Sequence, residues 1–255
     1  MHIKYLLPLL LVCSCHSNDA DNKSASSSPK KSNSKNEDAG KGDCSAYYWF
    51  KEGRQITYLQ KNADGKTTGE TIVNINKVSS SGDTLIAEIA TTIGNKIEPI
   101  TLKYKCIGTK VLIDLNSMLS NNMFKTMMTK KNMSMEMSSG YLEFPYSMKV
   151  GDELAASAVE IKVKMDNSIF MSATSKVNSR KVEAKENVTT PAGSWNCYRI
   201  SEQREMIMDI KGMTMPAQKT KSEQWFADGF GIVKQNFYDA DGKLQLSSEL
   251  KEIKN

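Results

Sequence analysis

In the stretch AVEIKVKM (158–165), Val159 to Met165 alternate strictly between apolar and charged side chains. An extended chain places the apolar residues on one side and the charged residues on the other, which is typical of an antiparallel strand with one buried face. The same period of two recurs less regularly in three other stretches, TLIAEIATTI (84–93), ITLKYKC (100–106) and KVLIDL (110–115). Turn signals, among them Asp64-Gly65, Ser139-Gly140 and Asp241-Gly242, punctuate the chain at short intervals. We therefore predict an all-β, mainly antiparallel fold, either a curved meandering sheet or an open barrel.

The N-terminal residues have the layout of an export signal. Lys4 precedes the apolar run YLLPLLLV (5–12), and small residues follow at positions 13 and 14. A helix that spans a bilayer needs about 20 apolar residues, so this run is too short to serve as one. Residues 1–14 are predicted to be a signal peptide that is removed.

Cys15 is the predicted site of lipid attachment. The tetrapeptide VCSC (12–15) resembles bacterial lipoprotein signals, which have an aliphatic residue three positions before the modified cysteine and a small residue directly before it. Cys15 meets both conditions through Val12 and Ser14, whereas Cys13 would follow bulky Val12 directly. A diacylglycerol and an N-acyl chain together anchor a protein stably to a membrane. The expected location is the bacterial cell envelope, on the outer membrane; the alternative is an ordinary secreted protein cleaved nearby.

Composition divides the remainder into a tether and one domain. Residues 15–43 hold the lipidated cysteine and a polar, Ser-, Asn- and Lys-rich segment that buries too little apolar surface to fold, so we expect a disordered linker. Residues 44–255 are long enough for a single domain with a substantial core. They carry 28 Lys and Arg against 24 Asp and Glu, spread along the chain, which disfavours a nucleic-acid partner.

Histidine and cysteine usage limits the chemistry. The only histidines are His2 and His16, so the predicted domain lacks the imidazole that Ser-His-Asp and Cys-His catalysis and common zinc hydrolase sites require. We expect no enzymatic activity and no cofactor. Of the three domain cysteines, Cys44 and Cys106 are the preferred disulfide pair in an oxidising compartment, with Cys197 as a buried free thiol, although sequence alone leaves the connectivity open.

One segment departs from the β pattern. Residues 116–131, NSMLSNNMFKTMMTKK, carry apolar side chains at helical spacing, with Asn116 as the expected N-cap. A single amphipathic helix in a β protein packs most simply into the concave side of the sheet. The candidate contacts for an apolar ligand there are Met118, Phe124, Met127 and Met128.

Methionines recur at alternate positions in three further runs, MSMEM (133–137), MIM (206–208) and MTM (213–215). Thioethers select Cu(I) and Ag(I), so a metal site is one interpretation. Its candidate ligands are Met133, Met135, Met137, Met206 and Met208. Core filling is the favoured alternative, because methionine packs irregular apolar gaps and alternation is expected of any half-buried strand. A variant of core filling has these side chains line a cavity for a lipid.

Several phrases resemble a known family. The segments RKVEAKENVTTPAGSWNCYRI (180–200) and EQWFADGFGIVKQNFYDADGKL (223–244), together with LIDLNSML and FPYSMKVGDEL, resemble the TapB-like family of exported bacterial lipoproteins, which is related to YmcC-like domains. The resemblance covers about residues 44–254 and implies no established activity. It implies an architecture similar to lipoprotein carriers, whose curved sheet encloses an apolar groove plugged by a helix.

These observations predict a membrane-anchored, non-enzymatic envelope lipoprotein that binds a lipid or another apolar small molecule in the concave face of its sheet. Two alternatives are a structural or protein-interaction lipoprotein with a solid core, and a Cu(I)- or Ag(I)-binding protein. The membrane is the expected partner through the lipid anchor, and protein partners stay unassigned.

Overall fold

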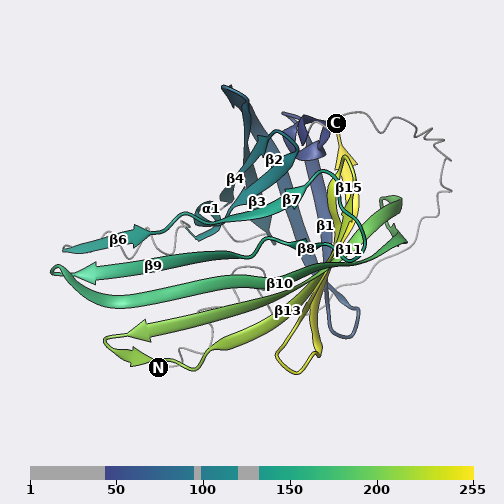
Figure 1. The fold of residues 1–255 in the computed structure, drawn as a ribbon. Helices are drawn as coiled ribbons and strands as arrows, with labels where there is room; N and C mark the ends of the chain where they lie inside the picture. The colour runs from purple at the N-terminus through teal and green to yellow at the C-terminus, as the bar shows by residue number, and fades with distance from the viewer. Residues whose placement is uncertain (1–43, 95–98, 120–131) are drawn as a thin grey trace.

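The computed structural model describes residues 44–94, 99–119 and 132–255, and these form one large antiparallel sheet that does not close (Figure 1). The prediction of an all-β, antiparallel fold is confirmed. The strands are β1 (Gln55–Asn62), β2 (Thr67–Ser81), β3 (Thr84–Ile93), β4 (Ile100–Ile107), β5 (Lys110–Asp114), β6 (Met133–Met137), β7 (Tyr141–Pro145), β8 (Glu153–Leu154), β9 (Ser157–Met165), β10 (Ser168–Thr190), β11 (Gly193–Ile210), β12 (Met213–Thr214), β13 (Gln218–Ala227), β14 (Gly231–Tyr238) and β15 (Leu244–Lys254). Within the described ranges, no helix has the length and apolar character needed to cross a membrane.

The order of the strands brings the two ends of the sheet together. The hydrogen-bonded path runs β6-β9-β10-β11-β13-β14-β15-β1-β2-β3-β4-β5-β7, so β6 and β7 are its edge strands. Only residues 138–140 separate these two strands along the chain. A Cβ on Gly140 would lie 2.5 Å from the Val159 side chain and 2.6 Å from the Ala158 carbonyl oxygen. Glycine is therefore required where the chain crosses from one edge of the sheet to the other.

The first strand along the chain, β1, pairs with the last, β15. β1 lies antiparallel to β15, with Gln55 opposite Lys254 and Asn62 opposite Leu246. Neighbouring pairs in the path are mostly sequential hairpins, so this pairing joins the N-terminal group of strands, β1–β5, to the C-terminal group. The sheet depends on contacts between residues far apart in the sequence.

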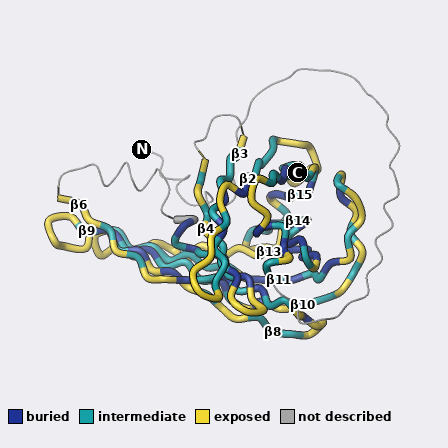
Figure 2. Tube along the Cα trace, turned by 90° about the horizontal axis from the view of Figure 1, so that it is seen from above, coloured by how far each residue is buried: buried dark blue, intermediate teal, exposed yellow. Residues whose placement is uncertain are grey.

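Two long strands carry the sheet into a projection. β10 has 23 residues and β11 has 18, and they pair over most of their length. Figure 1 shows β6, β9 and the adjoining ends of β10 and β11 extending to one side of the upright strands β1–β5, and Figure 2 shows the same projection from above. We call this projection the wing; it comprises β6, β9, β12 and the parts of β10 and β11 that pair with them.

The upright part encloses an aromatic core. The 3-10 helices η1 (Cys44–Ala46) and η2 (Tyr48–Phe50) bring buried rings onto the sheet. The ring centroids of Tyr47 and Phe226 are 5.6 Å apart. Phe144 stacks on Phe226, with 4.9 Å between their ring centroids. Gly231, at φ +121°, leaves room for the Trp49 indole, which a Cβ would approach to 2.5 Å. These contacts fix the N-terminal segment of the described chain against β13 and β14.

A disulfide holds the same segment. Cys44 forms a disulfide with Cys106 on β4, with 5.6 Å between their Cα atoms. This is the pair preferred from the sequence. Cys197 on β11 is a buried free thiol, and burial, with smaller contributions from Glu186 and Asp228, raises its pKa to about 12. This thiol is therefore protonated and unreactive at neutral pH.

The predicted helix begins one residue earlier than expected, at Leu115 instead of Asn116. Among the described residues it is the short α1 (Leu115–Leu119), and positions 120–131, with Phe124, Met127 and Met128, lie outside the described residues. Asn116 was predicted as the N-cap, and that was wrong: the Asp114 carboxylate accepts the Asn116 backbone N–H at 2.9 Å. Asp114 ends β5, so strand and helix follow one another directly and the cap falls two residues earlier.

Candidate functional site

The wing gathers the methionine runs onto one face. Residues directly opposite each other in neighbouring strands share a face of the sheet. Met135 on β6 is opposite Val163 on β9, Val163 is opposite Met171 on β10, and Met171 is opposite Ile210 on β11. The same reasoning extends through the other pairs. Ser175, opposite both Val159 and Met206, belongs to this face, and we call its apolar members the methionine face: Met133, Met135, Met137, Val159, Ile161, Val163, Met165, Met171, Ala173, Val177, Met206, Met208, Ile210 and Met213.

Exposure increases from the centre of this face to its end. Val159, Ile161 and Val163 are buried in the middle, whereas the methionines of β6 and β11 are half-buried. At the end of the wing, Met165 is 41% exposed and Met213 is 69% exposed. Large apolar side chains exposed in a contiguous patch mark a binding surface more often than isolated ones do.

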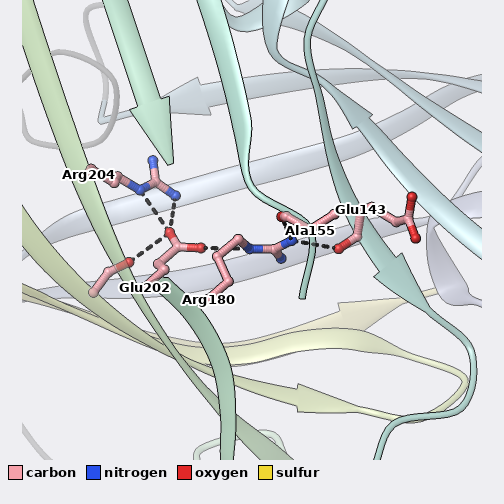
Figure 3. Close-up of polar contacts among 6 residues, drawn as sticks. Glu143, Ala155, Arg180, Glu202 and Arg204 are labelled. Atoms are coloured by element: carbon pink, nitrogen blue, oxygen red, sulfur yellow. Dashed lines mark hydrogen bonds and ion pairs between the residues drawn. The ribbon is translucent and has the colours of Figure 1, made fainter. Parts of the chain in front are cut away.

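A charged cluster adjoins the inner end of the methionine face (Figure 3). Glu202 and Arg204 lie on β11 on the same side of the strand as Met206, because strand side chains alternate. Glu202 Oε1 accepts hydrogen bonds from Arg204 Nε at 2.8 Å, from Arg204 Nη2 at 2.5 Å and from the Ser222 hydroxyl at 2.8 Å. On its other side, Glu202 Oε2 faces Arg180 Nε at 3.4 Å.

Arg180 lies in the interior of the protein together with Glu202. Its side chain is fully buried, as is that of Glu202, whereas the Arg204 side chain is 21% exposed. Arg180 Nη1 donates to the carbonyl oxygens of Glu143 at 2.8 Å and Ala155 at 3.1 Å. Its guanidinium also lies over the Phe144 ring, 4.9 Å from the centroid. The cation therefore contacts β7, the segment before β9 and the aromatic core at once.

A bulge in β10 directs Arg180 inward. The register between β10 and β11 shifts between Asn178 and Lys181, so Ser179 and Arg180 together face Glu202. Ser179 has φ +49°. The extra residue reverses the alternation, because Val177 before the bulge and Val182 after it are both buried. Bulges commonly re-aim one side chain in this way.

Arg180, Arg204 and Glu202 together carry one more positive than negative charge, and the Glu143 carboxylate, which also acts on Arg180, is itself paired with Lys110 Nζ at 2.7 Å. Two guanidiniums share one carboxylate, and both partners hold Glu202 ionised: burial raises its pKa, but Arg204 and Arg180 outweigh burial, so the pKa lies below its ordinary value. Burial lowers the pKa of Arg180, and Glu202 opposes that shift. Arg180 Nη2 and both amide atoms of the buried Gln224 have no hydrogen-bond partner among the described residues. Unpaired donors in a buried site are costly and are commonly met by water or a ligand.

The opposite face of the same strands carries a polar pocket of about 480 Å³. Ser201 pairs with Glu223 and Gln203 with Lys221, and all four lie on the side away from the Glu202 carboxylate. The pocket is lined by Ser179, Ser201, Glu202, Gln203, Lys221, Ser222, Glu223, Tyr238 and Gly242. Glu223 is held there by Arg199 Nη1 at 2.7 Å, so its carboxylate is already paired.

The other predicted site residues have separate positions. Cys15 lies outside the described residues, and so do Phe124, Met127 and Met128. Met118 belongs to α1, but the structure does not describe its side chain. The ligand contacts predicted from the 116–131 helix therefore stay predictions, and the apolar surface that the structure does describe comes from strands.

The five methionines considered as metal ligands share a face without converging. Met137 and Met208 are aligned across the wing, but β9 and β10 lie between them. Three strand spacings amount to about 14 Å, whereas a metal–sulfur bond is about 2.3 Å. A metal ion could therefore be bound only by a pair of methionines within one strand, not by all five. Among described residues, no three His, Cys, Asp or Glu side chains are grouped so as to hold a metal.

Comparison with known proteins finds one matching family and solved structures of similar fold. The profile of the DUF3108-like family matches residues 51–250. A Bacteroides fragilis protein described as exported, with a YmcC-like fold, is similar in structure, with a TM-score of 0.56 and 21% identity over 80% of this chain and 97% of that chain. A Parabacteroides distasonis protein described as a lipoprotein gives a TM-score of 0.59 and 16% identity over 80% of this chain and 96% of that chain. No curated protein matches the sequence.

Proposed function

We propose that this chain, which belongs to the DUF3108-like family, is a non-enzymatic lipoprotein of the bacterial envelope. The solved structures similar to it include proteins described as exported and as a lipoprotein. In this proposal the protein is anchored through Cys15, belongs to the TapB-like group within the family, and binds an apolar small molecule on the methionine face. The VCSC signal and the polar tether at 16–43 support the anchor.

The observation that carries the binding proposal is the register of the wing. It aligns apolar side chains from β6, β9, β10, β11 and β12 on one surface, half-buried at its flanks and exposed at its end. Methionine side chains are flexible and polarisable, so such a surface accepts ligands of variable shape. Burial of apolar area is favourable by about 25 cal/mol per Å², so a long acyl chain gains several kilocalories per mole by lying there.

We expect Met208→Glu to abolish ligand retention. A carboxylate in the half-buried centre of the β11 side of the face would need to be desolvated under an acyl chain. The measurement is native mass spectrometry of the full chain carrying Cys15→Ser, purified from the soluble fraction of the cells without added ligand. The parent protein should carry an adduct of lipid mass, and Met208→Glu should be bare.

Ile207→Glu is the matched control for that experiment. Ile207 is also half-buried and adjoins Met208, but strand alternation places it on the other side of β11. It should keep the adduct. A parent protein without adduct would instead favour the structural or protein-interaction alternative. A mass increase upon Ag(I) addition alone would favour the metal alternative.

We expect Cys15→Ser to move the protein from the membrane fraction to the soluble fraction. The substitution removes the thiol to which diacylglycerol is attached, and within the described residues no helix replaces the anchor. Fractionation with an alkaline wash and immunoblotting measures the change, with Cys13→Ser as the control that should stay in the membrane. Retention of Cys15→Ser in washed membranes would contradict the anchor assignment.

A further inference from the structure

The charged cluster and the methionine face form one continuous stripe along β11. Arg204, Met206, Met208 and Ile210 alternate onto the same side of the strand, and Met213 on β12 lies directly opposite Ile210 on the same face. At about 3.3 Å per residue, Arg204 to Ile210 spans about 20 Å. One acyl chain of a bilayer spans about half of its 30 Å hydrocarbon core. The stripe from Arg204 to Ile210 is therefore long enough for one extended acyl chain together with its head group.

The cationic end of the stripe has one positive charge that Glu202 does not neutralise. Arg204 directs Nε and Nη2 toward Glu202, and no described residue accepts a hydrogen bond from its Nη1. Its partial exposure, 21% of the side chain, contrasts with the complete burial of Arg180 and Glu202 behind it. Arg180 adds a second positive charge within the same cluster, with an unpaired Nη2. A single anion at Arg204 would bring the cluster to neutrality.

We propose that the ligand of the methionine face is a long-chain fatty acid, bound with its carboxylate on the outward side of Arg204 and its chain along Met206, Met208, Ile210 and Met213. This inference rests on the proposed function and adds the identity of the head group. A guanidinium matches a carboxylate in geometry and charge. The surplus of one positive charge fits a monoanion better than a doubly charged phosphate.

The test compares two ligands that differ only in their head group. Dodecanoate and dodecanol are titrated by calorimetry into the full chain carrying Cys15→Ser, whose own lipid cannot then occupy the stripe. We expect dodecanoate to bind about tenfold more tightly than dodecanol, because a charge-assisted hydrogen bond at a partly exposed site is worth about that factor. Higher salt should weaken only dodecanoate binding.

Substitutions at Arg204 then locate the head group. Arg204→Gln should lower dodecanoate affinity about tenfold and leave dodecanol affinity unchanged, which also shows that the variant is folded. Arg204→Lys should retain most of the preference. Lys219→Gln removes a positive charge next to Thr220, the residue opposite Arg204, but on the other face of the sheet, and should change neither affinity.

The outcomes separate the two proposals. Equal binding of dodecanoate and dodecanol, or an Arg204→Gln effect on both, overturns the fatty-acid inference and leaves apolar binding intact. Tighter binding of dodecyl phosphate than of dodecanoate also overturns it, in favour of a phosphate head group. Binding of neither ligand removes the proposed function and the inference together.

Discussion

Arg180→Met is expected to lower the free energy of unfolding by about 3–5 kcal/mol, the usual cost of removing one partner of a buried ion pair. Glu202 would stay fully buried with only Arg204 and Ser222 as partners. The carbonyl oxygens of Glu143 and Ala155 would lose their donor at the same time. Urea denaturation followed by tryptophan fluorescence measures the change, provided that the slope of the transition is unaltered.

Two comparisons isolate the buried charge as the cause. Arg199→Met alters an arginine on the other face of β11 that is 30% exposed, and its ion pair with Glu223 should contribute less than about 1 kcal/mol. The double variant Arg180→Met, Glu202→Met should recover part of the loss, since no buried carboxylate is then left short of a partner. A loss in Arg180→Met no larger than in Arg199→Met would contradict the role assigned to the cluster.

Loss of the disulfide is the second large effect. Replacing both Cys44 and Cys106 with serine should lower the free energy of unfolding by about 2–5 kcal/mol, because the bond closes a long loop of the unfolded chain, whose ends are 62 positions apart in the sequence. It also ties η1 to β4 beside the aromatic rings of Tyr47 and Trp49. Urea titrations with and without reductant give the measurement.

The reductant supplies the control for this prediction. The parent protein should become as unstable in reductant as the double serine variant is without it, and the variant itself should not respond. Cys197 remains in both proteins as a buried thiol and cancels in the comparison. A reductant effect of similar size in the variant would show that the disulfide is not its source.

Local alternation was sufficient to predict the strands. Val159 to Met165 form most of β9, and Val159, Ile161 and Val163 are buried as the period of two indicates, whereas Met165 at the end of the strand is 41% exposed. The methionines of each run were likewise predicted to share one strand face. Their union in a single surface was not predictable, because it depends on which strands pair. β6 lies beside β9, whereas β7, only three residues further along the chain, pairs with β5 at the other edge.

The charged cluster was missed for a local reason. In the sequence, Arg180 stands beside Ser179 and Lys181 and has the character of a solvated turn or strand edge. Its burial results from the bulge, which reverses the alternation between Val177 and Val182. A signal was present in the strict alternation of β11, which places Glu202 and Arg204 on the same side as Ile200 and Met206. Charged residues on an otherwise apolar strand face are candidates for a buried pair.

The pairing of β1 with β15 sets when the protein can fold. Lys61 and Glu249, which meet across these strands, are 188 residues apart in the sequence, so the two halves of the sheet cannot join before the last strand has been synthesised. Closing so long a separation is slow. For a chain exported as we propose, the delay is useful: the polypeptide stays unfolded during translocation and completes its sheet only after β15 has followed β1 across the membrane.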